Sequence, residues 1–399
     1  MRTYSHIVVG AGALGSAAAY WLAKSGYRDV LVLEQFELGN DRGASEDHSR
    51  IIRHSYHSAD YTALTPAAYA SWEELEEETG LQLVLRTGGL DLATLGTPGL
   101  EELANYRAAL GAARIPWEDL DASEVRSRYP QWEIEDDVVG MYQEDTGVLD
   151  IRRACAAQIA RAREMGVTFL PHTRATALRS SADHVTVGTD DGDFAAEHVV
   201  VCVASWLERL APSLDIDWRL TLTQEQVTYF ATPKVREFAP DRFSVWIWHG
   251  DNLFYGFPVY GEVAVKVARD MRGRWTTLDG RSYDTDPAEE DLLHGFLQRR
   301  LPDAVGPVLV SKTCVYDMPP DREFILDFVP GHPRIVLGVG AGHAAKFACL
   351  IGRILAELAT DGTTRYPIAP FTINRPALTD PGFVPTFRLK GAAAASAGD

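Results

Sequence analysis

A glycine-rich turn near the N-terminus constrains the fold of this 399-residue chain more than any other feature. Gly10, Gly12 and Gly15 follow the apolar run 6–9 with the spacing G-x-G-x-x-G, and small residues typical of a helix follow at 16–25. The first glycine permits a tight turn, the second lets the backbone approach a pyrophosphate, and the third allows the helix to pack closely on the strand. The N-terminus of the helix then favours the phosphate charge.

A second apolar strand is expected over 29–34, and it ends in Glu34. A carboxylate at this place can accept hydrogen bonds from ribose hydroxyls. Strand, turn, helix and strand together form one βαβ unit, which predicts nucleotide binding. The pattern does not separate NAD from FAD, and a purely structural turn followed by a chance acid is the alternative.

The composition excludes several other classes of protein. The net charge of −18 argues against nucleic acid or an anionic membrane as the main partner. The four cysteines are widely separated, so neither a metal site nor a disulfide framework is expected. No apolar run reaches the roughly 20 residues that a membrane helix needs. We interpret the apolar N-terminal stretch as part of the fold rather than a signal peptide, and we expect a cytoplasmic protein.

The length and the order of the expected elements favour two domains. Helices are expected over 62–79, 100–110, 151–165 and 343–359, and strands over 84–92, 167–170, 184–187, 198–203 and 334–337. The aromatic-rich segment 220–267 predicts an antiparallel sheet. The fold class is therefore α/β, with a Rossmann-type nucleotide domain and a second α+β domain that contains a large antiparallel sheet. We assign 1–85, 145–215 and 320–390 to the first domain, 86–144 and 216–319 to the second, and expect 391–399 to be a disordered tail.

Further motifs occur in a fixed order after the glycine-rich turn. They are 50–54 (RIIRH), 253–258 (LFYGFP) ahead of Lys266, 314–316 (CVY) with 320–327 (PDREFILD), 342–348 (GHAAKFA) and 373–376 (INRP). Together they resemble the D-amino-acid-oxidase superfamily of FAD-dependent oxidoreductases, and within it the branch of monomeric sarcosine oxidase and N-methyltryptophan oxidase.

The resemblance implies an oxidase that holds FAD, attached covalently through Cys314, and oxidises the C–N bond of a small amine-bearing acid, with O2 reduced to hydrogen peroxide. Arg53 and Lys346 would bind the substrate carboxylate, and Lys266 would lie where oxygen reacts. The branch is often monomeric. The remaining implied catalytic and substrate residues are Arg50, Tyr255, Tyr316 and Asp270. The implied cofactor-binding residues are Gly10, Gly12, Gly15, Glu34, Ser45, Arg50, Cys314, Gly342, His343 and Lys346.

These roles agree with elementary electrostatics. Two cations that face one carboxylate fix a small acid by charge-assisted hydrogen bonds. A cation near the flavin stabilises the negative charge that develops on oxygen, and Lys312 is placed to lower the pKa of the Cys314 thiol. Surface positions for the two arginines and for Lys346 are the alternatives. His343 fits a flavin neighbour and a simple hydrogen bonder at a helix start equally well.

The chain departs from the branch at several positions. Ser45 and Glu46 stand where the branch has a histidine pair, Asp270 replaces a histidine, and Ala344 and Ala345 replace a glycine and an aromatic residue. An anion at 270 suits a substrate with an extra cationic or hydroxyl group, unless it points away from the site. These departures predict a substrate other than plain sarcosine, namely an N-substituted or cyclic secondary amino acid.

Other functions fit parts of the pattern. A dehydrogenase with an acceptor other than O2, or a fructosyl amino acid oxidase, keeps the whole fold. An NAD-dependent dehydrogenase explains only the glycine-rich turn. A non-catalytic FAD-binding module leaves the clustered cations without a role.

Overall fold

The glycine-rich turn joins the first strand to the first helix, as the sequence predicts. The computed structural model describes residues 3–386, so the predicted tail 391–399 lies outside them. Strand β1 (Thr3–Val9), helix α1 (Ala13–Lys24) and strand β2 (Val30–Leu33) form the predicted βαβ unit, and β1 pairs in parallel with β2. None of the helices in the described part of the chain is both long and apolar enough to span a bilayer.

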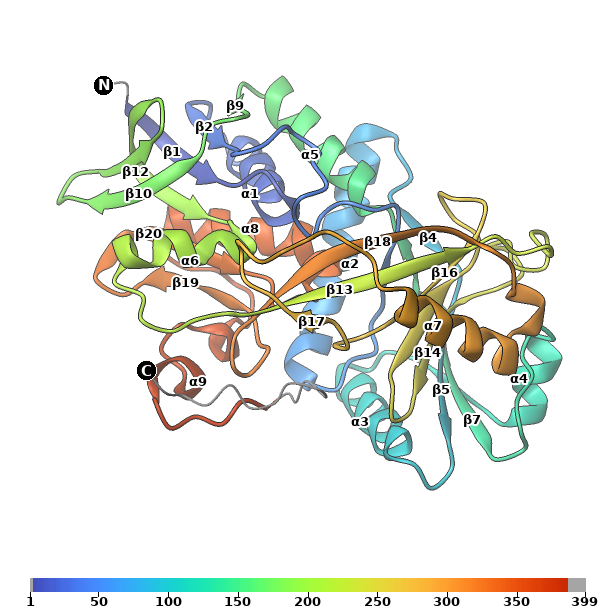
Figure 1. The fold of residues 1–399 in the computed structure, drawn as a ribbon. Coiled ribbons are helices and arrows are strands. Elements are labelled where there is room, and N and C mark those ends of the chain that lie inside the picture. Colours follow the sequence, from blue (N-terminus) through green and yellow to red (C-terminus); the bar gives the residue numbers. More distant parts are fainter. Residues whose placement is uncertain (1–2, 387–399) are drawn as a thin grey trace.

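The first sheet continues this unit with strands from distant parts of the chain (Figure 1). Its order is β10-β11-β12-β1-β2-β9, with β20 beside β12 and β19 beside β20. These further strands are β9 (Thr168–Leu170), β10 (Ala175–Ser180), β11 (Val185–Thr189), β12 (Gly192–Val201), β19 (Ile325–Val329) and β20 (His332–Val339). The parallel centre, β20-β12-β1-β2-β9, therefore carries the carboxyl ends of β1 and β2 at one edge.

Side chains of β1 alternate between two hydrophobic cores. Val8 packs with the helices on one face, while Ile7 and Val9 pack with the opposite face. Successive strand residues point to opposite faces, so a sheet that is covered on both sides needs apolar residues throughout. The helices that contribute to the first core are α1, α2 (Ala59–Thr79), α5 (Ile151–Glu164) and α8 (Ala348–Asp361), and the short α6 (Leu207–Leu210) contributes to the second.

A second, nine-stranded sheet confirms the antiparallel sheet expected over 220–267 and extends it. Its order is β17-β13-β16-β15-β14-β5-β7-β6, with β18 beside β13, and β14 pairs with β5 in parallel. The strands are β5 (Gly89–Thr94), β6 (Glu118–Leu120), β7 (Val138–Gln143), β13 (Thr221–Phe230), β14 (Val245–His249), β15 (Phe254–Phe257), β16 (Val265–Arg269), β17 (Arg274–Trp275) and β18 (Val308–Met318). Helices α3 (Pro98–Ala113), α4 (Ala122–Arg128) and α7 (Pro287–Arg300) accompany it.

Two long strands lead from the second sheet back towards the first. β13 and β18 pair along nearly their whole length and cross the middle of the molecule in Figure 1. A small third sheet, β3-β8-β4, consists of β3 (Arg50–Ile52), β4 (Val84–Arg86) and β8 (Gly147–Leu149), and its side chains pack against β14 and β15 of the second sheet. The fold is thus a Rossmann-type α/β part and an α+β part with a large antiparallel sheet. The residue boundaries that we assign to the two domains stay a prediction.

Some elements differ from their expected form. The predicted strands within 84–92 exist as β4 and β5, but they belong to different sheets and do not pair with each other. The helix expected from 343 begins as a 3-10 turn at Ala344–Phe347, and the α-helix α8 starts only at Ala348. Helix α7 was not predicted, because its buried face comprises only Leu293, Phe296 and Leu297.

Helices α1 and α8 cross at Gly352, which leads to a stability prediction. A methyl group built on Gly352 would lie 2.3 Å from the Cβ atom of Ala17. We expect Gly352→Ala to lower the free energy of unfolding by about 1–3 kcal/mol, since overpacking forces the helices apart. The midpoint of urea unfolding measures the change.

Gly295 in α7 provides a matched control, because its nearest neighbouring atom would lie 3.6 Å from an added methyl group. Gly295→Ala should raise the free energy of unfolding by up to about 1 kcal/mol through its effect on the unfolded chain. Equal effects of the two substitutions would contradict the assignment of Gly352 as a packing glycine.

Candidate functional site

The glycine-rich turn forms one wall of a cavity of about 490 Å³. Gly10 adopts a φ of 97°, and a methyl group on Gly15 would lie 1.9 Å from the carbonyl oxygen of Gly10. The first and third glycines are therefore required by the turn itself, as their spacing predicts. Glu34 also lines this cavity and is buried.

The carboxylate of Glu34 connects the end of β2 to the glycine-rich turn. Its two oxygens accept hydrogen bonds from the backbone amides of Ala11 (2.9 Å) and Phe36 (3.0 Å). Burial raises the pKa of Glu34, although these amide hydrogen bonds oppose the shift. Ser45 lies nearby, and its Oγ accepts a hydrogen bond from the amide of Ala13 in the first turn of α1 (2.9 Å).

A larger cavity of about 720 Å³ adjoins the first. Gly12, 43–46, Cys202 and Ala204 line both cavities, so the two are continuous at the N-terminus of α1. All ten predicted catalytic, substrate-binding and cofactor-binding residues that follow Ser45 in the sequence line the larger cavity. These are Arg50, Arg53, Tyr255, Lys266, Asp270, Cys314, Tyr316, Gly342, His343 and Lys346. The fold thus brings together side chains that lie far apart in the sequence.

Lys266 is almost fully buried at one side of this cavity. Its Nζ donates hydrogen bonds to Oδ2 of Asp47 (2.5 Å), to the carbonyl of Ser49 (2.9 Å) and to Oγ of Ser49 (3.2 Å). Burial lowers the pKa of Lys266 to about 8, although the charge of Asp47 acts in the opposite direction.

Asp47 is a residue that the sequence analysis missed. Besides Lys266, it accepts hydrogen bonds from Tyr229 (2.5 Å) and from Lys312 (3.4 Å), and Arg50 lies 3.4 Å away. Burial opposes its ionisation, but the charges of Lys266 and Arg50 hold the pKa of Asp47 far below its usual value. One aspartate in a polar loop is not distinguished by any sequence pattern, so only its position in the fold identifies it.

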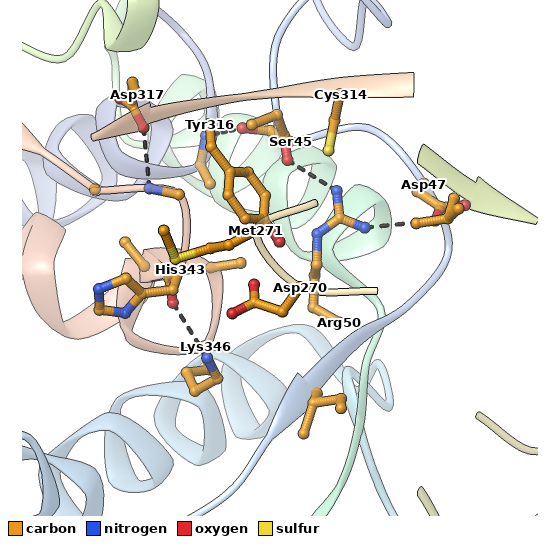
Figure 2. A pocket seen from close by; sticks show the side chains of 18 of the residues that line it. Ser45, Asp47, Arg50, Asp270, Met271, Cys314, Tyr316, Asp317, His343 and Lys346 are labelled. Carbon is orange, nitrogen blue, oxygen red and sulfur yellow. Dashed lines mark hydrogen bonds and ion pairs between the residues drawn. The ribbon is translucent and has the colours of Figure 1, made fainter. Parts of the chain in front are cut away.

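Arg50 has a structural role and does not lie on an open surface. Its guanidinium donates to the carbonyl oxygens of Ala44 (2.9 Å), Glu46 (2.8 Å) and Ser49 (2.9 Å), which fixes the loop before β3. Figure 2 shows the same guanidinium directed toward the space that Cys314 and Tyr316 also face.

Cys314 lies on β18 with its sulfur in the cavity wall (Figure 2). Burial raises the pKa of the thiol, and the nearby cation with the largest opposing effect is Arg50. The ammonium group of Lys312 contacts Asp47, and the cations with the largest effects on the thiol are Arg50, Lys266 and Arg281, so the role expected for Lys312 stays a prediction.

Arg53 and Lys346 occupy another side of the cavity. Arg53 donates hydrogen bonds to Asp91 and to the hydroxyl of Tyr106, both at 3.3 Å. Lys346 donates to the hydroxyl of Tyr56 (2.8 Å) and to the carbonyl of His343 (3.1 Å). Both cations line the cavity, so the alternative of freely exposed surface positions is wrong for them.

Asp270 faces the cavity but is not an unpaired anion. Arg322 binds both of its carboxylate oxygens at 3.0 Å. Burial opposes the ionisation of Asp270, yet the charge and hydrogen bonds of Arg322 lower its pKa. The motif 320–327 contains Arg322 without predicting a role for it, and its side chain adds a third cation to this side of the cavity.

His343 contributes a neutral, half-buried ring. Its Nε2 lies 3.0 Å from the carbonyl oxygen of Arg322, and the ring stacks on Phe324 at a centroid distance of 4.8 Å. Burial lowers the pKa of His343 well below its usual value. The adjacent amide of Gly342 donates to Asp317 (3.1 Å), whose pKa burial raises to about 7.

Comparison with known proteins shows the family of the chain. The family described as DAO, FAD dependent oxidoreductase, matches residues 5–358. The monomeric sarcosine oxidase of Bacillus sp. strain B-0618 is 30% identical over 94% of this chain and 96% of its own length. The N-methyl-L-tryptophan oxidase of Citrobacter koseri is 28% identical over 93% and 99%. Among solved structures, the open form of NikD, an unusual amino acid oxidase essential for nikkomycin biosynthesis, superposes with a TM-score of 0.82 at 27% identity, covering 93% of this chain and 98% of NikD.

The hydrogen bonds of Asp47 lead to a prediction. Asp47→Asn should lower the free energy of unfolding at pH 7 by about 3–5 kcal/mol, because it leaves the buried Lys266 without its counter-charge. The pKa of Asp47 is lower in the folded state than in the unfolded state. Its contribution to the free energy of unfolding is therefore complete above the unfolded-state pKa, and it is lost as the pH falls through the folded-state pKa. The difference in the free energy of unfolding between the wild type and the variant should therefore begin to decrease only below about pH 4.

Urea unfolding at several pH values measures this difference. Asp119→Asn is the matched control, because Asp119 forms an ion pair with Arg107 at the surface. That substitution should change the free energy of unfolding by less than about 1 kcal/mol. A similarly small effect of Asp47→Asn would show that the buried ion pair does not stabilise the site.

Proposed function

Since the chain belongs to the DAO family of FAD dependent oxidoreductases, we propose that it oxidises the C–N bond of an N-substituted or cyclic secondary amino acid and passes the electrons to O2. The observation that carries the proposal is the cavity in which Arg53 and Lys346 lie together with Lys266 and Cys314. Its products would be an imine and hydrogen peroxide.

The residues of the two adjoining cavities fit FAD. The second glycine leaves the N-terminus of α1 open to a diphosphate, since a methyl group on Gly12 would already lie 3.1 Å from Oγ of Ser45. Glu34 offers carboxylate oxygens to the ribose, and the cavity continues from there to Cys314. When bound, FAD supplies the two-electron redox chemistry.

Arg53 and Lys346 would hold the substrate carboxylate. A guanidinium and an ammonium group that face one cavity fix a small anion in position by charge-assisted hydrogen bonds. Asp91 and Tyr106 orient Arg53, while Tyr56 orients Lys346. Such an arrangement holds the C–H bond next to nitrogen in one place relative to the cofactor, which lowers the entropic part of the barrier.

Lys266 would stabilise the charge that develops as oxygen is reduced. It is buried and held by Asp47 and Ser49, so its charge is already oriented before the reaction. The second candidate function is a dehydrogenase that passes electrons to an acceptor other than O2. The contact with Asp47 favours it, because the aspartate neutralises part of the positive charge that would assist the reduction of O2.

The substrate would differ from plain sarcosine. Ala345 stands where the relatives of the branch carry a bulky ring, and it lines the larger cavity. Arg322 pairs with Asp270, so that carboxylate does not require a second cation on the substrate. We therefore propose that the substrate is a monocarboxylate with a larger N-substituent or a ring. From the resemblance to the monomeric sarcosine oxidase branch, we also propose a monomeric enzyme.

Release of hydrogen peroxide tests the proposed function. The panel comprises sarcosine, N-methyl-tryptophan, proline, pipecolate, sugar-modified amino acids and simple D-amino acids. A larger secondary amino acid should exceed sarcosine in kcat/KM by about 10-fold or more, as expected when a cavity has room for additional methylene groups. A peroxidase-coupled assay under air measures turnover.

Two results would contradict parts of this prediction. Equal kcat/KM on sarcosine and on the larger compounds would remove the argument from Ala345. Bleaching of the yellow protein by a substrate without oxygen, combined with no peroxide under air, would favour the dehydrogenase.

Covalent attachment through Cys314 is tested by acid precipitation. We expect the yellow colour of the purified protein to stay in the pellet, and Cys314→Ser to release it into the supernatant, because a hydroxyl is a much weaker nucleophile than a thiolate at neutral pH. Cys349→Ser is the matched control, since Cys349 is buried and its thiol donates to the carbonyl of Ser71. Colour in the supernatant of the wild type would refute covalent attachment and leave FAD binding intact.

A further inference from the structure

Lys346 differs from the other cations of the larger cavity in its partners. Its Nζ contacts the hydroxyl of Tyr56 and the carbonyl of His343, and both groups are uncharged. Among residues 3–386, no carboxylate forms an ion pair with it, whereas Arg53 has Asp91, Arg322 has Asp270, and Lys266 has Asp47. A positive charge on Lys346 therefore has no counter-charge until a ligand arrives.

The neighbours of Lys346 also disfavour its charge. Arg53 and Lys346 lie on the same Tyr56 ring, each 5.1 Å from its centroid. The charged or titratable groups that face Lys346 are Arg50, Arg53, Tyr56, Asp270, Arg322 and His343. Three of these are cations, one is an anion that Arg322 already binds, and burial keeps both Tyr56 and His343 neutral. Burial and the charge of Arg53 lower the pKa of Lys346 well below its usual value.

The chemistry of the proposed substrate requires the loss of a proton. A secondary amino acid is a zwitterion at neutral pH, and its ammonium nitrogen has no lone pair to support removal of a hydride from the neighbouring carbon. The amine must therefore lose a proton before oxidation, and a group in the cavity has to accept that proton. A carboxylate beside Lys346 supplies the counter-charge that Lys346 lacks, so binding itself favours the charged lysine.

We propose that Lys346, beyond binding the substrate carboxylate, accepts the proton that the substrate ammonium loses on binding. The N–H bond of the ammonium breaks and its electron pair stays on nitrogen, while a new N–H bond forms at Nζ. No electrons are transferred in this step, and the total charge of the site is unchanged. The inference rests on the proposed function and assigns a second role to the same site.

Other groups in the cavity are poorer acceptors. Asp270 is held ionised by Arg322, and a carboxylate with a lowered pKa binds a proton weakly. Lys266 already has a counter-charge, because its Nζ donates hydrogen bonds to Asp47 and to Ser49. The lysine without a counter-charge is the group whose proton affinity rises when a carboxylate enters.

Proton uptake by the FAD-containing protein tests the inference without turnover. The probe is propionate, a carboxylate without an amine, and the change of flavin absorbance reports its binding. In weakly buffered solution near pH 8, an indicator dye should show uptake of up to about one proton per propionate bound by the wild type. Lys346→Arg should bind propionate and take up none, because a guanidinium is always charged. Lys234→Arg, at an exposed position, should behave as the wild type.

The pH dependence of kcat/KM on the best substrate of the panel gives a second readout. Without the acceptor, only the small fraction of substrate that is already neutral reacts. Lys346→Arg should therefore lose about 100-fold or more at pH 7 and approach the wild type as the pH nears the pKa of the substrate amine. A purely structural role would lower kcat/KM by the same factor at every pH.

The possible failures are distinguishable. If propionate changes the flavin spectrum but no proton is taken up between about pH 6 and 10, Lys346 is already charged, and the inference is wrong while the proposed function stands. An equal loss of kcat/KM at all pH values overturns it as well. If no amine of the panel is oxidised, the proposed function fails, and the inference fails with it.

Discussion

The cavity between the two large sheets depends on one buried carboxylate. Asp47 contacts Lys266 on β16, Tyr229 on β13 and Lys312 on β18, and it lies beside Arg50 at the start of β3. Charged groups are costly to bury unless they are paired and hydrogen-bonded. Asp47 contacts several cations at once. It therefore connects its own loop, which precedes β3, to the strands of the second sheet.

The pairing of charges explains how the rest of the cavity can hold so many cations. Arg53 and Arg322 each have their own aspartate, which lies in the second sheet or at the end of one of its strands. These carboxylates compensate most of the positive charge, and they leave Lys346 as the place where an added negative charge is most favourable. This distribution of charge supports the proposed binding of one carboxylate, and under that proposal the proton affinity of Lys346 depends on whether the carboxylate is present.

Sequence reasoning identified most of the fold, and the residues that it predicts for the reacting site line one cavity, for reasons that can be stated. The βαβ unit, the helices α2, α5 and α8 and the antiparallel sheet follow from periodicity and from glycine, which are local signals. The cavity residues were found through ordered motifs that match a family. No role was predicted for Asp47, Asp91 and Arg322. Asp47 and Arg322 lie in loops and Asp91 lies in the short strand β5, and a single charged residue in any of these places acquires its partner only through contacts far along the chain.

The sequence by itself determined that the chain builds a nucleotide-binding turn, since only glycine fits where Gly15 meets the carbonyl of Gly10. It also determined which cationic residues were available to the cavity. Only the tertiary structure decided their electrostatic states: it paired Asp270 with Arg322, directed Lys312 to Asp47 and left Lys346 with neutral partners. The physical reason is that the energy of a charge depends on burial and on the distance to other charges, and both quantities are set by residues far apart in the chain.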